Sequence, residues 1–142
     1  MSAFDVVYPL RYSEDGTAQP FPTIYYLTDA KLLHAMSELE RHQHIRKLEQ
    51  TLAANSALMA AYHAEHAAYR DTRWAMLTGE DRQTVEASPS LSRSFRGGIA
   101  GIADFDTVKC LHAQYAYHLA KQEEGGTTLG RLIDEFLSEG CH

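Results

Sequence analysis

The sequence predicts an α+β fold: a mostly helical single domain in which an N-terminal two-stranded β-hairpin packs on about five helices. β-Branched and aromatic residues, which favour strands, are concentrated in the first 28 residues. Apolar residues recur with the helical period through most of the remaining chain. A length of 142 residues is ordinary for one domain. We therefore expect residues 1–142 to share one core.

The hairpin is expected over residues 3–28. Its strands would be Phe4–Tyr12 and Phe21–Thr28, and the segment between them contains an Asp15-Gly16 turn signal. Each strand contains a proline, which has no amide to donate, so the strands should be short or lie at a sheet edge. A hairpin alone is marginally stable, and we expect it to pack on the helices.

A helical region is expected over residues 29–87. A first helix, Ala30–Arg41, has Thr28 or Asp29 as its cap. After a short second helix, Asn55 or Ser56 caps a long third helix, which extends to about residue 77.

The last third of the chain is predicted to combine a loop with two helices. Residues 88–106 are expected to form an irregular, glycine-rich loop, and long loops in compact domains often carry function. Asp106 is a suitable cap for a helix beginning at Thr107, and a final helix comes after two adjacent glycines. Residues 107–140 thus form the C-terminal helices.

The composition narrows the classes of function. A net charge of −6 without a basic stripe argues against nucleic-acid binding. No apolar window approaches the length of a bilayer span, and the first residues lack the pattern of a signal peptide, so we expect no membrane association and a cytoplasmic location. In that compartment Cys110 and Cys141 should be reduced or metal-bound rather than disulfide-bonded. A buried structural thiol with a second thiol at the chain end is the alternative.

The glycine-rich loop suggests a site for a small anion, a phosphate or a carboxylate. Glycines allow backbone amides to approach a ligand, and nearby basic side chains would add charge. The expected anion-binding residues are Arg96, Gly97, Gly98, Gly101 and Lys109. The loop matches neither the P-loop nor the dinucleotide fingerprint. A tight connection that binds nothing is the competing interpretation.

The helix after the loop carries a thiol and two imidazoles. Lys109 and a helix N-terminus would favour the thiolate of Cys110. In regular helix, however, Cys110 and His112 differ by about 200°, and His112 and His118 by about 120°. The first pair could share an ion only if the helix begins later than Thr107. Cys110 and His118 are also candidate catalytic residues, although both histidines could instead be hydrogen-bonded core residues.

The long third helix contributes a further candidate catalytic residue, Glu65, which lies on its apolar stripe. A carboxylate there must find a partner, such as Arg73 or a histidine, or act as an acid. His63 and His66 share one helix face and could co-ligate a metal. Their spacing is not that of a zinc protease, and a solvated polar face is the favoured interpretation.

Three segments resemble a known family. FPTIYYLT, RGGIAGI and VKCLHAQYAYHLA are together similar to the bacterial family called Domain of Unknown Function 501, over about Tyr8 to Cys141. The family has no established activity, so the resemblance implies a site rather than a reaction. Its pattern matches the glycines near Arg96 together with Lys109, Cys110, His112, His118 and Cys141.

One departure from the family pattern concerns Asp29. Where members commonly have Leu-Thr-Cys-Pro, this chain has Leu27-Thr28-Asp29-Ala30. An aspartate can replace a cysteine as a ligand of zinc or iron but not in a dithiol reaction. The resemblance therefore implies one zinc or iron ion, with the ligands Asp29, Cys110, His112 and Cys141.

Three hypotheses of function remain open. The first is a metal- or anion-binding domain with hydrolytic activity, in which a coordination position stays open for water. The second is a non-enzymatic module that binds a protein partner or a second copy of itself through exposed aromatics such as Tyr25, Tyr26 or Trp74. The third is an enzyme with Cys110 as nucleophile and a histidine as base.

Overall fold

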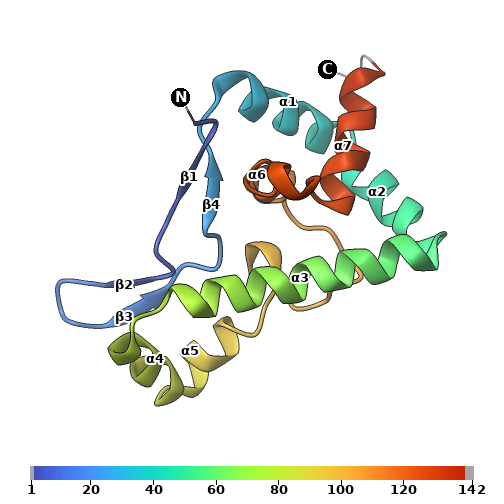
Figure 1. The fold of residues 1–142 in the computed structure, drawn as a ribbon. Coiled ribbons are helices and arrows are strands. Elements are labelled where there is room, and N and C mark those ends of the chain that lie inside the picture. Colours follow the sequence, from blue (N-terminus) through green and yellow to red (C-terminus); the bar gives the residue numbers. More distant parts are fainter. Residues whose placement is uncertain (1, 140–142) are drawn as a thin grey trace.

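The computed structural model describes residues 2–139 and shows an α+β fold that is mostly helical (Figure 1). The strands are β1 (Phe4–Val6), β2 (Leu10–Tyr12), β3 (Ala18–Pro20) and β4 (Tyr25–Leu27). The α-helices are α1 (Ala30–Arg41), α2 (His44–Ala53), α3 (Ser56–Met76), α4 (Gly79–Glu86), α5 (Pro89–Ser94), α6 (Leu111–Ala120) and α7 (Thr128–Ser138). The described residues also contain two 3-10 turns, η1 (Ile99–Gly101) and η2 (Gln122–Glu124).

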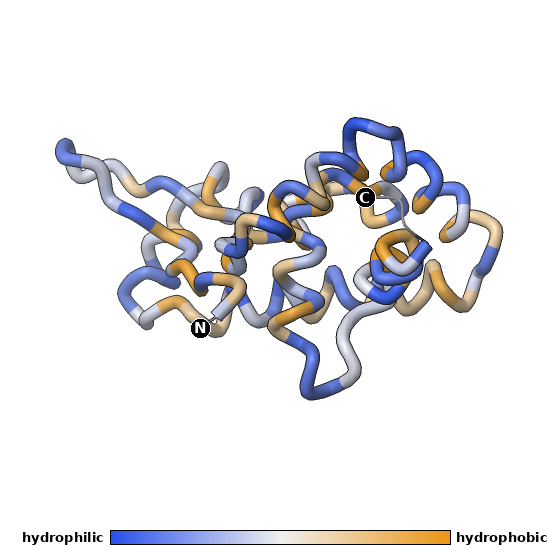
Figure 2. The backbone as a smooth tube through the Cα atoms, turned by 90° about the horizontal axis from the view of Figure 1, so that it is seen from above, coloured by the Kyte–Doolittle hydropathy of each residue, from blue (hydrophilic) through white to orange (hydrophobic). Residues whose placement is uncertain are grey.

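The N-terminal hairpin is bent in the middle. β1 pairs antiparallel with β4, and β2 pairs antiparallel with β3, so the first predicted strand is broken into β1 and β2, and the second is shortened to β4. Pro9 and Pro22 lie in the breaks, where their missing amides interrupt the ladder. β3 lies in the segment expected to be turn, because the turn closes tightly around Gly16, whose φ is +84°. The hydrophilic tip projects from the body of the molecule (Figure 2).

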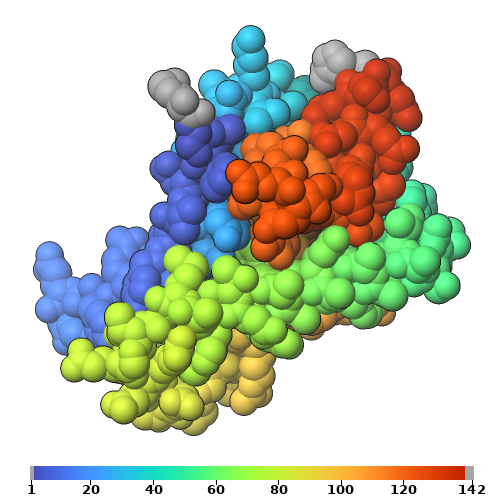
Figure 3. Space-filling view, viewed as in Figure 1, coloured from blue at the N-terminus to red at the C-terminus, as the bar shows by residue number. Residues whose placement is uncertain are grey.

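α6 is the central helix of the fold. It packs on β4, α1 and α7, and Figure 1 shows these elements around it, with the long α3 crossing beside them. All residues from Ala113 to His118 are buried, as the apolar character of both its faces suggested. In Figure 3 one end of α6 reaches the surface between the hairpin and α7.

Most predicted helix starts are confirmed by their caps. Asp29 accepts a hydrogen bond from the Leu32 amide, Asn55 from two amides of α3, and Thr127 from the Gly130 amide. Between them these side chains satisfy amides that have no partner within the helix.

The predicted start of α6 at Thr107 is wrong. Asp104, rather than Asp106, organises the local chain: its side chain accepts the Asp106 amide and its carbonyl accepts the Thr107 amide. Asp106 instead faces His63, and the chain stays extended until Cys110, the true N-cap residue. The expected irregular segment also contains the short helix α5, which Ser88 caps and a proline begins.

The described residues contain no helix with the length and apolar character needed to cross a bilayer.

Candidate metal centre

Glu40, Cys110 and His112 bring one potential ligand atom each to a common point. The carboxylate oxygen, Sγ and a ring nitrogen all lie within 4.8 Å of one another. Sγ of Cys110 is 4.0 Å from Nδ1 of His112, which is itself 3.3 Å from Oε2 of Glu40. All three residues are partly exposed, so the cluster is open to solvent. Carboxylate, thiolate and imidazole together form a donor set that zinc and ferrous iron accept.

The late start of α6 makes this cluster possible. Cys110 has extended backbone angles, with φ −140° and ψ 115°, while His112 already lies in the first turn of the helix. The 200° separation expected for regular helix therefore does not apply, and both side chains lie on one side. The condition for a Cys110–His112 pair, a later helix start, is fulfilled.

Glu40 supplies both the third ligand atom and the reason for that helix start. Its Oε2 accepts the amide of Leu111 at 2.8 Å, so a side chain from α1 acts as the cap that Cys110 does not provide. Glu49 of α2 similarly accepts the Val108 amide at 2.8 Å. Two glutamates thus hold the extended segment before α6 in place.

The two ring nitrogens of His112 have different partners. Nδ1 faces both Cys110 and Glu40, whereas Nε2 lies 3.1 Å from Oγ of Ser37 on α1. An outer hydrogen bond of this kind orients a histidine ligand and fixes its tautomer. A thiol–imidazole–carboxylate relay would need the thiol and the carboxylate at opposite nitrogens, which is not the arrangement here.

Glu40 and Ser37 were not predicted from the sequence. A signal for Glu40 was present, because it follows Leu33 and Met36 at helical spacing and borders the apolar side of α1. The same type of signal singled out Glu65 on α3.

Two of the four expected metal ligands are not part of the described cluster. Asp29 caps the opposite end of α1, about 16 Å from Glu40 at the helical rise of 1.5 Å per residue. Cys141 lies outside the described residues. The structure therefore brings together Cys110 and His112 of the predicted set.

The glycine loop makes internal hydrogen bonds that were not predicted from the sequence. The amides of Gly98, Ile99 and Gly101 already donate within the protein, to Ile102, His66 and Gly98 respectively. The carbonyls of the loop point at the guanidinium of Arg73, which is buried. It donates to Pro22 O at 2.8 Å, to Gly98 O at 3.0 Å, to Phe95 O at 3.3 Å and to Gly97 O. The loop thus surrounds the guanidinium with carbonyls while three of its amides are bonded within the protein, and anion binding by the loop stays a prediction.

Close packing explains why glycines occupy this loop. A Cβ on Gly98 would lie 2.3 Å from the His66 ring, and one on Gly97 would lie 2.5 Å from the carbonyl oxygen of Gly101. The two basic residues of the predicted anion site are both exposed. Lys109 is exposed on the segment before α6, and Arg96 is exposed beside α5.

Glu65 and His118 meet at the N-terminus of α7, away from Cys110. Glu65 Oε2 accepts the amide and the hydroxyl of Thr128, both at 2.8 Å. His118 accepts the Thr127 amide at Nδ1 and faces Asp134 through Nε2 at 3.0 Å. His112 and His118 are about 9 Å apart along α6. The Glu65 partner is therefore neither Arg73 nor a histidine but the start of a helix.

His66 contradicts the interpretation of a solvated polar face. It is fully buried, stacks on Phe105 with ring centroids 4.7 Å apart, and accepts the Ile99 amide at 3.0 Å. Burial lowers its pKa to about 4. His63 is partly exposed and lies 2.6 Å from Asp106, so the two histidines do not form a metal pair.

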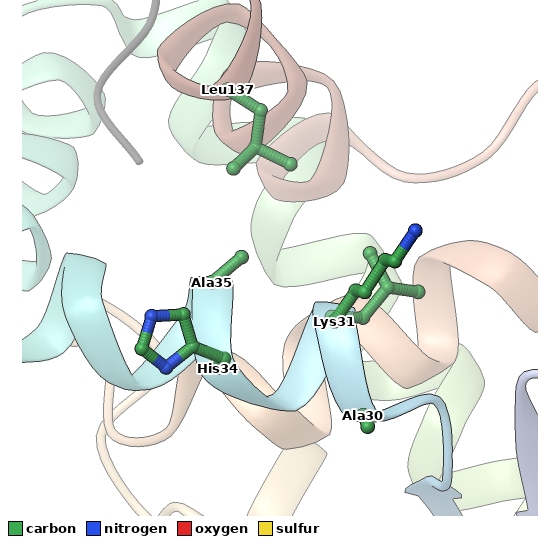
Figure 4. A pocket seen from close by; sticks show the side chains of 6 residues that line it. Ala30, Lys31, His34, Ala35 and Leu137 are labelled. Carbon is green, nitrogen blue, oxygen red and sulfur yellow. The ribbon is translucent and has the colours of Figure 1, made fainter.

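An apolar groove between α1 and the end of α7 is separate from the cluster. Figure 4 shows Leu137 facing α1 across it, with Lys31 and His34 as the polar residues of its lining. The groove lining includes none of Ser37, Glu40, Cys110 and His112. Of the three aromatic residues that a binding module was expected to expose, Tyr26 is exposed, whereas Tyr25 and Trp74 are half-buried.

Comparison with known proteins gives a family but no activity. No curated protein and no solved structure matches the chain. A family model described as "Protein of unknown function (DUF501)" matches residues 4–135, which include every residue of the Glu40–Cys110–His112 cluster. The resemblance noted from three short segments extends over nearly the whole chain, which therefore belongs to the DUF501 family.

Proposed function

We propose that the protein binds one zinc or ferrous ion through Glu40, Cys110 and His112. The observation that carries this proposal is the convergence of Sγ, Nδ1 and a carboxylate oxygen within 4.8 Å. In a tetrahedral zinc site, bond lengths of roughly 2.0–2.3 Å place ligand atoms about 3.3–3.6 Å apart. The separation between Nδ1 and Oε2 is 3.3 Å, and that between Sγ and Nδ1 is 4.0 Å. The second distance exceeds the tetrahedral range by a few tenths of an ångström, so the thiol would have to approach Nδ1.

The surroundings of the cluster support this proposal. Oγ of Ser37 lies 3.1 Å from Nε2 of His112, and a proton held on Nε2 by this contact would leave Nδ1 free to ligate. Oε2 of Glu40, which accepts the Leu111 amide, is also the carboxylate oxygen that lies 3.3 Å from Nδ1 of His112.

A hydrolytic activity is the more specific part of the proposal. Three protein ligands leave one tetrahedral position for water, which is the composition of catalytic zinc sites, whereas structural sites have four protein ligands. A metal-bound water would then act as the nucleophile on a small substrate. Cys141, predicted as a ligand from the sequence, is the residue that would close this position.

Metal content measured on protein purified without an affinity tag tests the binding step. We expect one ion per chain, and a thiolate-to-metal charge-transfer band after cobalt substitution. Cys110→Ser should abolish the band, and Glu40→Gln and His112→Ala should each weaken binding about tenfold or more. His63→Ala is the matched control, because His63 also faces a carboxylate but lies outside the cluster. Substoichiometric metal that is unaffected by Cys110→Ser would overturn the proposal.

Cys141→Ser separates the two kinds of metal site. With an open position, this variant keeps its cobalt spectrum and its affinity. A loss equal to that of Cys110→Ser would mean a closed, four-ligand structural site, and the hydrolytic part of the proposal would fail. Rapid alkylation of Cys110 in metal-free protein, together with no metal binding, would instead favour the thiol enzyme.

A further inference from the structure

A second concave site, independent of the metal cluster, lies where α3, α4 and α5 meet. It has a volume of about 280 Å³. Its apolar part consists of Trp74, Val85 and Phe95, and the two aromatic rings meet edge to face with centroids 6.0 Å apart. A cavity of roughly 150 Å³ is enough to hold benzene, so this one has room for a ring with a substituent.

Arginines surround this apolar part. Arg70 and Arg96 line the cavity, and the guanidinium carbon of Arg82 lies 5.9 Å from the Trp74 ring centroid. Among residues 2–139 the only carboxylate in ion-pair distance of these arginines is that of Asp71, whose Oδ1 is 3.3 Å from Arg70 Nε. Asp71 is well exposed, so the pair is weak and a ligand can displace it.

A fourth arginine adds positive charge behind the wall of the cavity. Arg73 is 1% exposed, and its guanidinium carbon lies 5.7 Å from the Phe95 ring centroid. Its two terminal nitrogens donate to backbone carbonyls, which supply no net negative charge. Within the described residues no carboxylate pairs with it. In a chain of net charge −6, this cavity therefore has a locally positive potential.

We propose that the cavity binds a small aromatic acid. The ring would lie against Trp74 and Phe95, and the carboxylate or phosphate would lie between Arg70 and Arg96. Guanidinium groups hold such acids with two parallel hydrogen bonds, and a half-buried aromatic wall supplies apolar contact. Arg96, expected from the sequence to bind an anion at the glycine loop, would bind it here instead.

Trp74 is the only tryptophan of the chain, so its fluorescence reports this site alone. Titration with phenyl phosphate should change that fluorescence in a saturable way, and benzoate should compete. Inorganic phosphate lacks the ring and phenol lacks the charge, so both should bind at least tenfold more weakly. A response to phosphate equal to that of phenyl phosphate would show an adventitious anion site and overturn the proposal. An equal response to phenol would show a purely apolar cavity and do the same.

Two substitutions of exposed residues sharpen the test. Arg96→Gln should weaken phenyl phosphate binding about tenfold or more, through loss of a charged hydrogen bond. Asp71→Asn should strengthen it several-fold, because Asp71 competes with the ligand for Arg70. Arg46→Gln, a change at α2 outside the cavity, is the control and should leave binding unchanged. Equal affinities of the Arg96→Gln and Arg46→Gln variants would contradict the proposal.

Discussion

His118 is enclosed on every side of its ring. Asp134 faces Nε2, the Thr127 amide faces Nδ1, and two glycines lie against the ring itself. A Cβ on Gly126 would be 2.2 Å from the ring, and one on Gly130 would be 2.0 Å from it. The absence of side chains at these glycines is therefore what allows α7 to pack on α6.

Gly130→Ala should lower the free energy of unfolding by about 1–3 kcal/mol or more, because the added methyl group has to displace the His118 ring. Gly79→Ala is the matched control: it also lies in a helix, and a Cβ there would have no heavy atom within 4 Å. Its effect should be near zero or slightly stabilising. Urea denaturation of the two variants measures the difference. Equal stabilities would mean that α7 is not packed against His118 as described.

Single residues were predictable from the sequence where a local rule applied. Caps such as Asp29, Asn55 and Thr127 depend on amides within three residues, so the sequence contains the whole interaction. Glu40 and His66 depend on partners more than thirty positions away, Leu111 and Ile99. Helical periodicity places Glu40 beside the apolar side of α1 but does not reveal such partners, which is why Glu40 was not predicted as a member of the cluster.

Arg73 of α3 connects the glycine loop with the hairpin. Four carbonyls, from Pro22 in the hairpin and from Phe95, Gly97 and Gly98 in the loop, accept its hydrogen bonds. The sequence suggested that the glycines donate to a ligand. A loop that turns its carbonyls inward has the same composition, so the direction of its peptide groups could not be predicted.

Arg73→Met keeps much of the length of the side chain but removes every donor. We expect a loss of stability on the order of 3 kcal/mol or more, since several buried carbonyls would lose their partners. Amide hydrogen exchange should accelerate in both the hairpin and the segment from Phe95 to Gly101. Arg70→Met, one turn away and partly exposed, should change neither quantity appreciably. Faster exchange in only one of the two segments would show that Arg73 does not hold both the hairpin and the loop in place.

For the whole molecule, buried histidines make stability depend on pH. Burial lowers the pKa of His66 to about 4 from an ordinary 6.5, and burial also lowers the pKa of His44. The unfolded chain therefore takes up protons between about pH 6.5 and 4 that the folded chain does not. The contribution of the neutral histidines to the free energy of unfolding is fully present above pH 6.5 and decreases as the pH falls through this window.

His66→Asn tests this dependence, because an asparagine can still accept the Ile99 amide but does not titrate. Between pH 6.5 and 4 the unfolding free energy of the wild type should fall more than that of the variant. The difference should be on the order of 2–3 kcal/mol. Chemical denaturation at several pH values provides the measurement, with His34→Asn, an exposed site on α1, as control. Parallel pH profiles for the wild type and His66→Asn would refute the assignment.

Three glutamates from the first half of the chain accept amides from the last third. Glu49 meets Val108, Glu40 meets Leu111 and Glu65 meets Thr128, at sequence separations of 59, 71 and 63 residues. During synthesis the ribosome releases these carboxylates long before their partners exist. Because contacts between residues this far apart in the sequence slow folding, the nascent N-terminal half should remain incompletely folded until the last third is synthesised. The Glu40–Cys110–His112 cluster would then be among the last features of the molecule to form. A chain that ends before residue 108 would contain the three glutamates but neither Cys110 nor His112.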